Sequence, residues 1–181
     1  KLIRKSGGKS DYTVRFNQNL RAAVIVCSDS VSAQKKQDKA GQAILDRMEK
    51  LPVTVEKYAC IPDDIAQIQD KVAWATQNKL DFIIFTGGTG LSTRDQTPEA
   101  LLPLLETRLL GIEEAMRHYG QERTPYAMLS RSLAGMVGKT LVLSVPGSTK
   151  GAAESVEAIF PSILHVFKIV KGSLNAHDRP V

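Results

Sequence analysis

The chain has 181 residues, of which 43% are hydrophobic, and its formal net charge is +5. A chain of this size buries roughly 70% of its unfolded surface in one core. Its apolar runs fall far short of the roughly 20 residues that span a bilayer. We therefore expect one compact domain without a membrane span.

The positive charge is compatible with two kinds of partner, nucleic acid or an anionic small molecule. Lys and Arg residues are spread along the chain, and the aromatic residues, 6% of the total, are not interleaved with them. A stacking platform for single-stranded nucleic acid is therefore unsupported. Cys27 and Cys60 form no CxxC pair, which argues against a disulfide scaffold or a structural zinc site. The first ten residues lack the apolar stretch of a secretory signal, so we expect a cytoplasmic protein that binds no nucleic acid.

The first half of the chain alternates strand and helix patterns. Residues 22–27, AAVIVC, are typical of a buried strand and end in the polar SDSVS. Residues 41–51 place apolar side chains on one helical face, and residues 53–61 then alternate as a strand does. After the breaker IPDD, an apolar stripe predicts a helix from Ile65 to about Asn78.

The next elements follow the same alternation. Residues 80–86, LDFIIFT, are a second continuously apolar strand. A glycine loop at 87–90 follows at once, and Thr97-Pro98-Glu99 opens another helix.

The last part of the chain contains one more strand and a helix. A small-residue segment at 132–137 leads to the strand at 140–145, which ends in Pro146-Gly147-Ser148. Residues 150–170 predict one long helix. Alternating strands and helices predict an α/β fold, a three-layer αβα sandwich with a mostly parallel sheet.

Ligands of such sheets bind beyond the carboxyl ends of the strands. The polar loops at 28–32, 86–97 and 146–150 each follow an apolar strand. We therefore expect these three loops to converge at one edge of the sheet and to form the functional site.

The glycine loop has two explanations. Glycines at 87, 88 and 90 let several backbone N–H groups converge on a phosphate, and the helix near Thr97 adds its positive end. Alternatively, the loop is a tight turn that needs glycine for positive φ angles. Its spacing matches neither GxxxxGK[ST] nor GxGxxG, so neither of those nucleotide-binding motifs is present here.

Two carboxylates are candidate ligands of Mg²⁺. Asp63 follows the strand at 53–61 and Asp95 follows the glycine loop, so both can face the same crevice. Magnesium on a nucleotide takes one or two protein carboxylates, with phosphate oxygens and waters completing its octahedron. The alternative role for Asp63 is to cap the next helix, which Asp64 could do instead. Ser148 has a similar ambiguity between an anion site and a helix cap.

The most specific motif is TGGTGLSTRDQTPEA at 86–100, which strongly resembles the molybdopterin adenylyltransferase family of molybdenum cofactor biosynthesis. That family includes the G domain of gephyrin. Further matching segments, in the same order and spacing, are SDS at 28–30 with Asp38 and Gly41 after it, IPDD at 61–64, LSRSLAG at 129–135 and VPGSTKGAAE at 145–154. The resemblance covers about residues 20–171.

The resemblance implies a molybdenum cofactor biosynthesis (molybdopterin-binding) fold and a homotrimer. It implies transfer of AMP from ATP to molybdopterin, with Mg²⁺ as cofactor and pyrophosphate as the second product. It implies that Asp63 and Asp95 are catalytic and bind Mg²⁺ or support adenylyl transfer. The substrate- or nucleotide-binding residues that it implies are Ser28, Asp29, Gly87, Gly88, Thr89, Gly90, Ser132, Gly135, Pro146, Gly147 and Ser148.

The first residues, KLIRKSGGKSDY, resemble the carboxyl tail of cyclic pyranopterin monophosphate synthase. This resemblance implies a fused or associated synthase domain, although an expression remnant or a disordered basic arm would explain the segment as well. We expect residues 1–18 to be a linker or the tail of an upstream domain. Residues 19–172 are the expected adenylyltransferase domain and residues 173–181 a flexible tail.

Two other functions compete with adenylyl transfer. A molybdopterin-binding or scaffold protein of the same fold would not transfer AMP. The presence of both Asp63 and Asp95 favours the enzyme, because a pure binder needs no pair of carboxylates beside an anionic ligand. A nucleotide pyrophosphatase or amidase sharing this fold would be expected to carry extra catalytic domains.

Overall fold

The computed structural model describes residues 19–172, so the predictions of a linker at 1–18 and a tail at 173–181 lie outside the described residues. A six-stranded sheet with the order β2-β1-β3-β6-β5-β4 forms the centre of the molecule. The strands are β1 Leu20–Cys27, β2 Val53–Ile61, β3 Phe82–Thr86, β4 Thr107–Arg108, β5 Ala134–Val137 and β6 Thr140–Val145. β2, β1, β3 and β6 run parallel to one another. β5 pairs antiparallel with β6, and β4 pairs antiparallel with β5.

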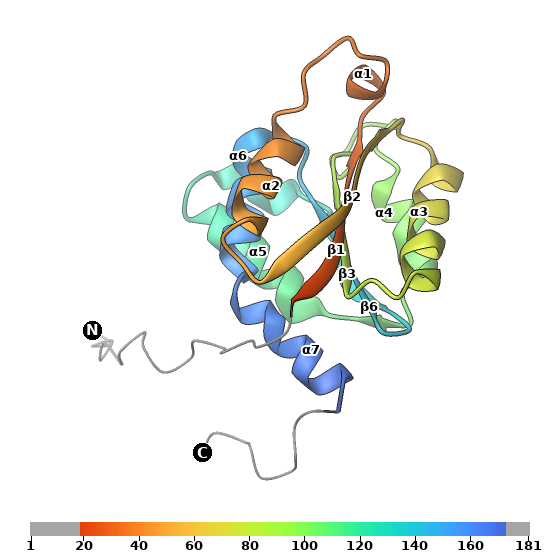
Figure 1. Ribbon diagram of the computed structural model, residues 1–181. Helices are drawn as coiled ribbons and strands as arrows, with labels where there is room; N and C mark the ends of the chain where they lie inside the picture. The colour runs from red at the N-terminus through yellow and green to blue at the C-terminus, as the bar shows by residue number, and fades with distance from the viewer. Residues whose placement is uncertain (1–18, 173–181) are drawn as a thin grey trace, which may run out of the picture.

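Helices cover both faces of the sheet (Figure 1). One face packs against α2 Ala40–Met48, α5 Leu110–Gln121, α6 Thr149–Ile159 and α7 His165–Val170. The other face packs against α3 Ile65–Gln77 and α4 Thr97–Leu101. The short helix α1, Asp29–Ser32, lies above the carboxyl ends of the parallel strands. The predicted three-layer αβα sandwich with a mostly parallel sheet is confirmed.

The central strands are apolar because both of their faces are covered. In β1, Ala22 and Val24 belong to the core on the α2 side, while Ala23 and Ile25 belong to the core on the α3 side. A strand between two helical layers has no face for polar side chains, so its sequence is a continuous apolar run. The edge strand β2 instead alternates between half-buried and exposed residues along its first part.

Two segments differ from the sequence prediction. The small-residue segment at 132–137 contains β5, which pairs with β6 as an antiparallel hairpin. The predicted helix at 150–170 is broken, because α6 ends at Ile159 and Phe160 is extended at φ −91° and ψ 143°. Pro161 causes the break, since proline disfavours helical geometry in the preceding residue. A 3₁₀ turn, Ser162–Leu164, then leads into α7.

Three 3₁₀ turns complete the described chain, η1 Leu102–Leu104, η2 Pro125–Leu129 and η3 Ser162–Leu164. Among residues 19–172, the structure contains no helix with the length and apolar character needed to cross a membrane. The irregular segments that matter most for the site are the loops above the carboxyl ends of β1, β2, β3 and β6.

Stability should depend on the two-sided core. We expect Ile84→Ala to lower the free energy of unfolding by about 2–5 kcal/mol, because Ile84 is fully buried in the centre of β3. The control is Ile169→Ala on α7, where the parent side chain is 59% exposed and the change should be within about 0.5 kcal/mol. Urea unfolding followed by circular dichroism measures both, and equal losses would contradict this description of the core.

Candidate active site

The three polar loops meet at the carboxyl edge of the sheet, as predicted. The hydroxyl of Thr86 donates to the carbonyl of Pro146 over 2.8 Å, which joins the loops after β3 and β6. The backbone N–H of Asp29 donates to a carboxylate oxygen of Asp63 over 3.3 Å, which joins the loops after β1 and β2. Arg94, in the segment after the glycine loop, forms an ion pair with Asp29 and so links the loop after β3 to the loop after β1.

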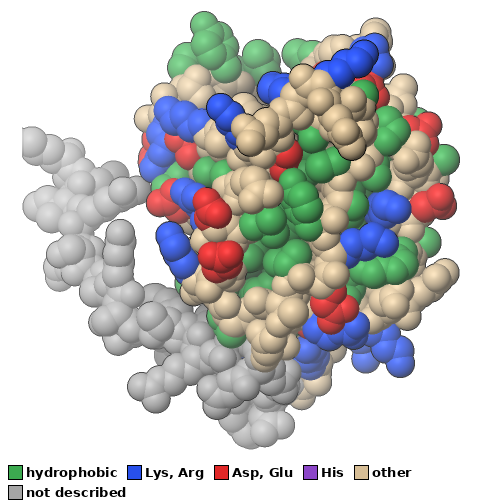
Figure 2. Space-filling model, turned by 45° about the horizontal axis from the view of Figure 1, so that its top comes forward, with side chains coloured by type: hydrophobic (Ala, Val, Ile, Leu, Met, Phe, Trp, Pro, Cys, Tyr) green, Lys and Arg blue, Asp and Glu red, His purple; other side chains and the backbone are tan. Residues whose placement is uncertain are grey.

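Two adjoining pockets open at this edge. The α2-side pocket, about 620 Å³, lies beside the start of α2, and the α5-side pocket, about 600 Å³, lies beside α5. Gly88, Asp95 and Gly147 line both pockets, so the two form one bipartite cleft around these residues. Figure 2 turns this edge toward the viewer and shows Lys and Arg side chains gathered along the upper part of the face.

Most of the predicted binding residues line this cleft. The α2-side pocket contains Ser28, Asp63, Gly87, Gly88, Asp95 and Gly147. The α5-side pocket contains Gly88, Thr89, Gly90, Asp95, Ser132, Pro146, Gly147 and Ser148. Gly135 instead lies in β5, where an added Cβ would approach Thr107 O to 2.7 Å, and it lines neither pocket. The structure therefore does not bring Gly135 into the cleft.

The glycine loop is held in an unusual backbone geometry. Gly87 and Gly88 have φ angles of 103° and 60°, which side-chain-bearing residues rarely adopt. A Cβ on Gly87 would also lie 2.1 Å from the carbonyl oxygen of Cys27. Thr97 locks the loop, because its hydroxyl donates to Gly87 O over 2.9 Å and its N–H donates to Gly88 O over 3.1 Å. The turn explanation for these two glycines is confirmed, and it leaves them lining the cleft.

The neighbouring aspartates after β2 have different roles. Asp64 caps α3, because its carboxylate accepts the Gln67 N–H over 2.9 Å. The cap alternative for Asp63 is therefore wrong. Asp63 Oδ1 is buried and has no hydrogen-bond partner among the described residues. It faces the glycine loop, since a Cβ on Gly88 would lie 2.8 Å from it.

The environment of Asp63 disfavours its negative charge. Burial raises the pKa of the Asp63 carboxyl, and the nearby charges of Asp29 and Asp95 raise it further. The Asp29 N–H bond and the Arg94 guanidinium act in the opposite direction. A buried acceptor without a partner costs about 1–3 kcal/mol, and more when it is charged. A cation beside Asp63 Oδ1 would remove both the missing contact and the repulsion.

The two aspartates near Asp63, Asp95 and Asp29, support this arrangement. Asp95 lies next to Gly90, and one of its oxygens accepts the Ser92 N–H over 2.9 Å. Asp29 lines neither pocket, and its Oδ1 accepts the Asp63 N–H over 3.2 Å. Asp29 therefore fixes the position of Asp63 through hydrogen bonds, whereas Asp63 and Asp95 line the cleft.

Two of the predicted serines also act as helix caps. Ser148 accepts the Gly151 N–H over 3.1 Å at the start of α6, and Ser28 accepts the Val31 N–H over 3.4 Å at the start of α1. The cap explanation for Ser148 is thus confirmed, and its place on the wall of the α5-side pocket leaves it available to a ligand as well. Ser132 is nearly fully buried, and its hydroxyl lies 2.8 Å from that of Ser130.

Sequence reasoning missed Arg131, which connects the loop after η2 to the glycine loop. Its Nε donates to Gly90 O and its Nη2 to Asp95 O, both over 2.8 Å, and its backbone N–H donates to Thr89 O over 3.0 Å. It also forms an ion pair with Glu99. Arg131 lies inside the motif LSRSLAG, so the motif marked the right segment but not the residue that holds the loop.

Two lysines were missed as well. Lys36 and Lys39 line the α2-side pocket together with Asp38. They lie in the connection between α1 and α2, a segment whose sequence, KKQDK, looks like an ordinary solvated loop. Only the folding of this connection over the carboxyl edge of the sheet brings the lysines to the cleft.

The raised pKa of Asp63 predicts a pH dependence of stability. The folded state holds the Asp63 proton more tightly than the unfolded chain, whose aspartates titrate near pH 3.9. The parent therefore loses stability as the pH rises from that value through the higher folded-state pKa. We expect D63N, which cannot ionise, to be more stable than the parent at about pH 7.5 without divalent metal. The difference should shrink as the pH falls to about 3.5. Urea unfolding at both pH values measures it, and a D63N protein less stable than the parent at the higher pH would contradict it.

Known proteins share the sequence pattern and the fold of this chain. The family model described as "Probable molybdopterin binding domain" matches residues 23–165. A molybdenum cofactor biosynthesis bifunctional protein of Chlorobaculum tepidum is 37% identical over 97% of this chain and 55% of its own length. The chain thus spans about half the length of the bifunctional relatives that it matches. Molybdenum cofactor biosynthesis protein B of Staphylococcus carnosus is 34% identical over 90% of this chain and 91% of its own.

Solved structures of similar fold point to the same family as the sequence matches. The molybdopterin biosynthesis enzyme MoaB of Thermus thermophilus superimposes with a TM-score of 0.80 at 40% identity, covering 84% of this chain and 97% of the other. A MogA structure gives 0.78 at 27% identity, covering 83% and 99%. The family match spans every strand of the sheet except the first residues of β1, and it includes both pockets. The chain therefore belongs to the molybdopterin-binding MoaB/MogA family of molybdenum cofactor biosynthesis proteins.

Proposed function

We propose that this chain is a molybdopterin adenylyltransferase, which transfers AMP from ATP to molybdopterin and releases pyrophosphate. The observation that carries the proposal is the unpartnered, buried Oδ1 of Asp63 beside Gly88, with Asp95 at the junction of the two pockets. A protein that only bound molybdopterin would have no use for a buried carboxylate oxygen that lacks a partner.

The pockets differ in character, which supports a separate place for each substrate. The α2-side pocket has Lys36, Lys39 and the hydroxyl of Ser28, groups that suit the phosphates of ATP. The α5-side pocket has apolar walls from Met116, Tyr126, Ala127 and Leu129 and hydroxyls from Ser130, Ser132 and Ser148. A flat pterin with a polar edge suits apolar walls with a few placed polar groups.

The residues present fit a nucleotide-bound Mg²⁺. Among residues 19–172 there is no group of three or more His, Cys, Asp or Glu side chains that could hold a metal ion by themselves. Two carboxylates, Asp63 and Asp95, are the number that magnesium on a nucleotide usually takes from a protein. When bound there, the ion would neutralise phosphate charge as the transfer proceeds.

The chemistry is a direct displacement. An oxygen of the molybdopterin phosphate attacks the α-phosphorus of ATP, a new P–O bond forms, and the bond from the α-phosphorus to the bridging oxygen breaks, so that pyrophosphate leaves. The chain's own part is alignment and electrostatics. Arg131 and Thr97 fix the glycine loop between the pockets, and Asp29 with Arg94 fixes Asp63. Alignment of two bound substrates can contribute about 7–11 kcal/mol to lowering the barrier.

Labelled ATP distinguishes the three candidate functions. The protein is incubated with molybdopterin, Mg²⁺ and ATP labelled at the α-phosphate. We expect the label to appear on molybdopterin together with pyrophosphate. Binding of molybdopterin with the label left on ATP would indicate a binding or scaffold protein, and release of free labelled AMP would indicate a pyrophosphatase.

Kinetic measurements should distinguish the roles of Asp63 and Asp95 from that of the neighbouring helix cap, Asp64. We expect D63N and D95N to lower the turnover of AMP transfer by about 10²- to 10³-fold while molybdopterin still binds, because each variant removes electrostatic stabilisation and keeps the shape. Asp64→Ala is the matched control. It should cost about 1 kcal/mol of stability through the lost cap of α3 and leave turnover unchanged. If D63N or D95N transferred AMP at the parent rate at limiting Mg²⁺, the substituted residue would be structural and would not act in catalysis.

We further propose that the chain forms a homotrimer and that a cyclic pyranopterin monophosphate synthase domain is fused to it or associates with it. The family resemblance supports the trimer, and the bifunctional relatives support the second domain. Light scattering at micromolar concentration should give about three times the 19.8 kDa mass of the chain. A mass of one chain under these conditions would contradict the trimer.

A further inference from the structure

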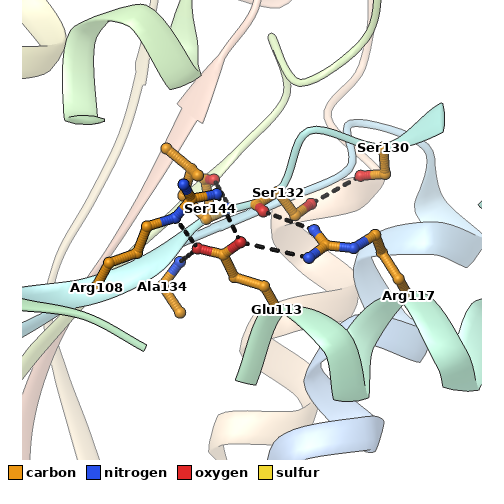
Figure 3. Close-up of polar contacts among 8 residues, drawn as sticks. Arg108, Glu113, Arg117, Ser130, Ser132, Ala134 and Ser144 are labelled. Atoms are coloured by element: carbon orange, nitrogen blue, oxygen red, sulfur yellow. Dashed lines mark hydrogen bonds and ion pairs between the residues drawn. The ribbon is translucent and has the colours of Figure 1, made fainter. Parts of the chain in front are cut away.

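A fully buried carboxylate lies beneath the wall of the α5-side pocket. Glu113 on α5 is 0% exposed, and its side chain lies between two arginines (Figure 3). Arg108 binds it with both arms of its guanidinium, through Nε at 2.8 Å and Nη2 at 2.9 Å. The backbone N–H of Ala134 adds a third bond at 3.3 Å. A buried carboxylate needs such partners, because a buried charge left without a partner strongly destabilises the fold.

The second arginine contacts the same carboxylate more loosely. Arg117 lies one helical turn after Glu113, and its Nη2 is 3.4 Å from Glu113 Oε2. Its Nη1 donates to Ser132 O over 3.3 Å. Since one carboxylate faces two guanidiniums and Arg108 makes the short bidentate contact, the positive charge of Arg117 is incompletely compensated. Only two of the five N–H donors of Arg117 are used in these contacts.

The surplus charge lies on the wall of the α5-side pocket. Among the described residues that line this pocket, Arg117 is the only Lys or Arg. Arg108 does not line it. One of the two acidic residues of the pocket, Glu154, already lies near Arg123 at 3.5 Å and Lys150 at 3.8 Å. Of the lining residues that the structure describes, Arg117 is therefore the side chain that offers both unused donors and a positive charge to a ligand.

We propose that Arg117 binds an anionic group of the pocket's ligand and that Glu113 is the positioning residue that aims it. This inference rests on the proposed placement of molybdopterin in the α5-side pocket. The anionic group is a phosphate oxygen or a dithiolene sulfur, since molybdopterin carries both. Ser130 and Ser132, whose hydroxyls lie 2.8 Å apart beside Arg117, complete a polar corner in a pocket with apolar walls (Figure 3).

The two arginines offer a matched pair of variants. R117Q removes the pocket's cation and leaves the bidentate Arg108–Glu113 pair. R108Q removes the stronger partner of Glu113 and substitutes no residue that lines the pocket. Binding of molybdopterin is titrated under anaerobic conditions without ATP. We expect R117Q to weaken binding about 10- to 100-fold, the usual effect of losing a charged hydrogen-bond partner. We expect R108Q to lower the unfolding temperature and to weaken binding less than R117Q does, because Glu113 can then pair more closely with Arg117 and withdraw part of its charge from the pocket.

Salt dependence and a conservative variant separate a binding role from a structural one. The affinity of the parent and of R117K for molybdopterin should fall as the salt concentration rises, because salt screens the positive charge at position 117. The affinity of R117Q should depend less on salt, because this variant lacks that charge. If R108Q is too unstable to purify, R117K serves as the folded comparison. Inorganic phosphate as competitor identifies the anionic group, since competition that disappears in R117Q assigns the phosphate oxygen and competition equal in both assigns the sulfur.

Parent-like affinity and salt response in R117Q would overturn the inference, as would equal losses in R117Q and a folded R108Q. The titration is independent of AMP transfer. If the chain binds molybdopterin through Arg117 but transfers no AMP, the proposed enzyme activity is wrong and this inference stands. If the enzyme is active but its R117Q variant binds molybdopterin normally, this inference is wrong and the proposed activity stands.

Discussion

The site depends on one buried carboxylate oxygen that has no hydrogen-bond partner within residues 19–172. Asp63 Oδ1 lies against the glycine loop, and the surrounding residues keep it there. Asp64 takes over the cap of α3, Asp29 holds the other side of Asp63, and Gly88 leaves space because it has no side chain. Without a bound cation this arrangement costs stability, as the raised pKa of Asp63 indicates. We interpret that cost as strain retained for binding a cation.

The sheet places the groups that surround this oxygen. Parallel strands end at the same edge, so loops far apart in sequence meet above β1, β3 and β6. Hydrogen bonds between loops then set their relative positions. Arg131 makes two of them to the glycine loop and a third to the carbonyl of Asp95. The antiparallel extension by β5 and β4 brings Arg108 and Ala134 to Glu113, and so supports the wall of the second pocket.

Local features of the site could be predicted from the sequence, whereas long-range ones could not. The buried strands are continuous apolar runs, and the glycine loop and both cleft aspartates follow them directly, so their shared edge could be inferred. The sequence does not decide between Asp63 and Asp64 as helix cap, because the two adjacent aspartates differ only in their backbone geometry. Arg131, Lys36 and the pair of Glu113 with Arg108 depend on contacts between segments that come together only on folding. The long helix was wrongly predicted because the effect of Pro161 on Phe160 was overlooked.

We propose that Asp63 and Asp95 together hold the metal ion of a bound nucleotide at the junction of the pockets. The most direct test is a crystal structure with a non-hydrolysable ATP analogue and Mn²⁺ in place of Mg²⁺, in which anomalous scattering locates the ion. We predict one manganese peak within direct ligand distance of Asp63 Oδ1, an Asp95 carboxylate oxygen and the phosphates. A peak coordinated by phosphates and waters alone, or one elsewhere in the cleft with Asp63 Oδ1 still unpartnered, would contradict the account.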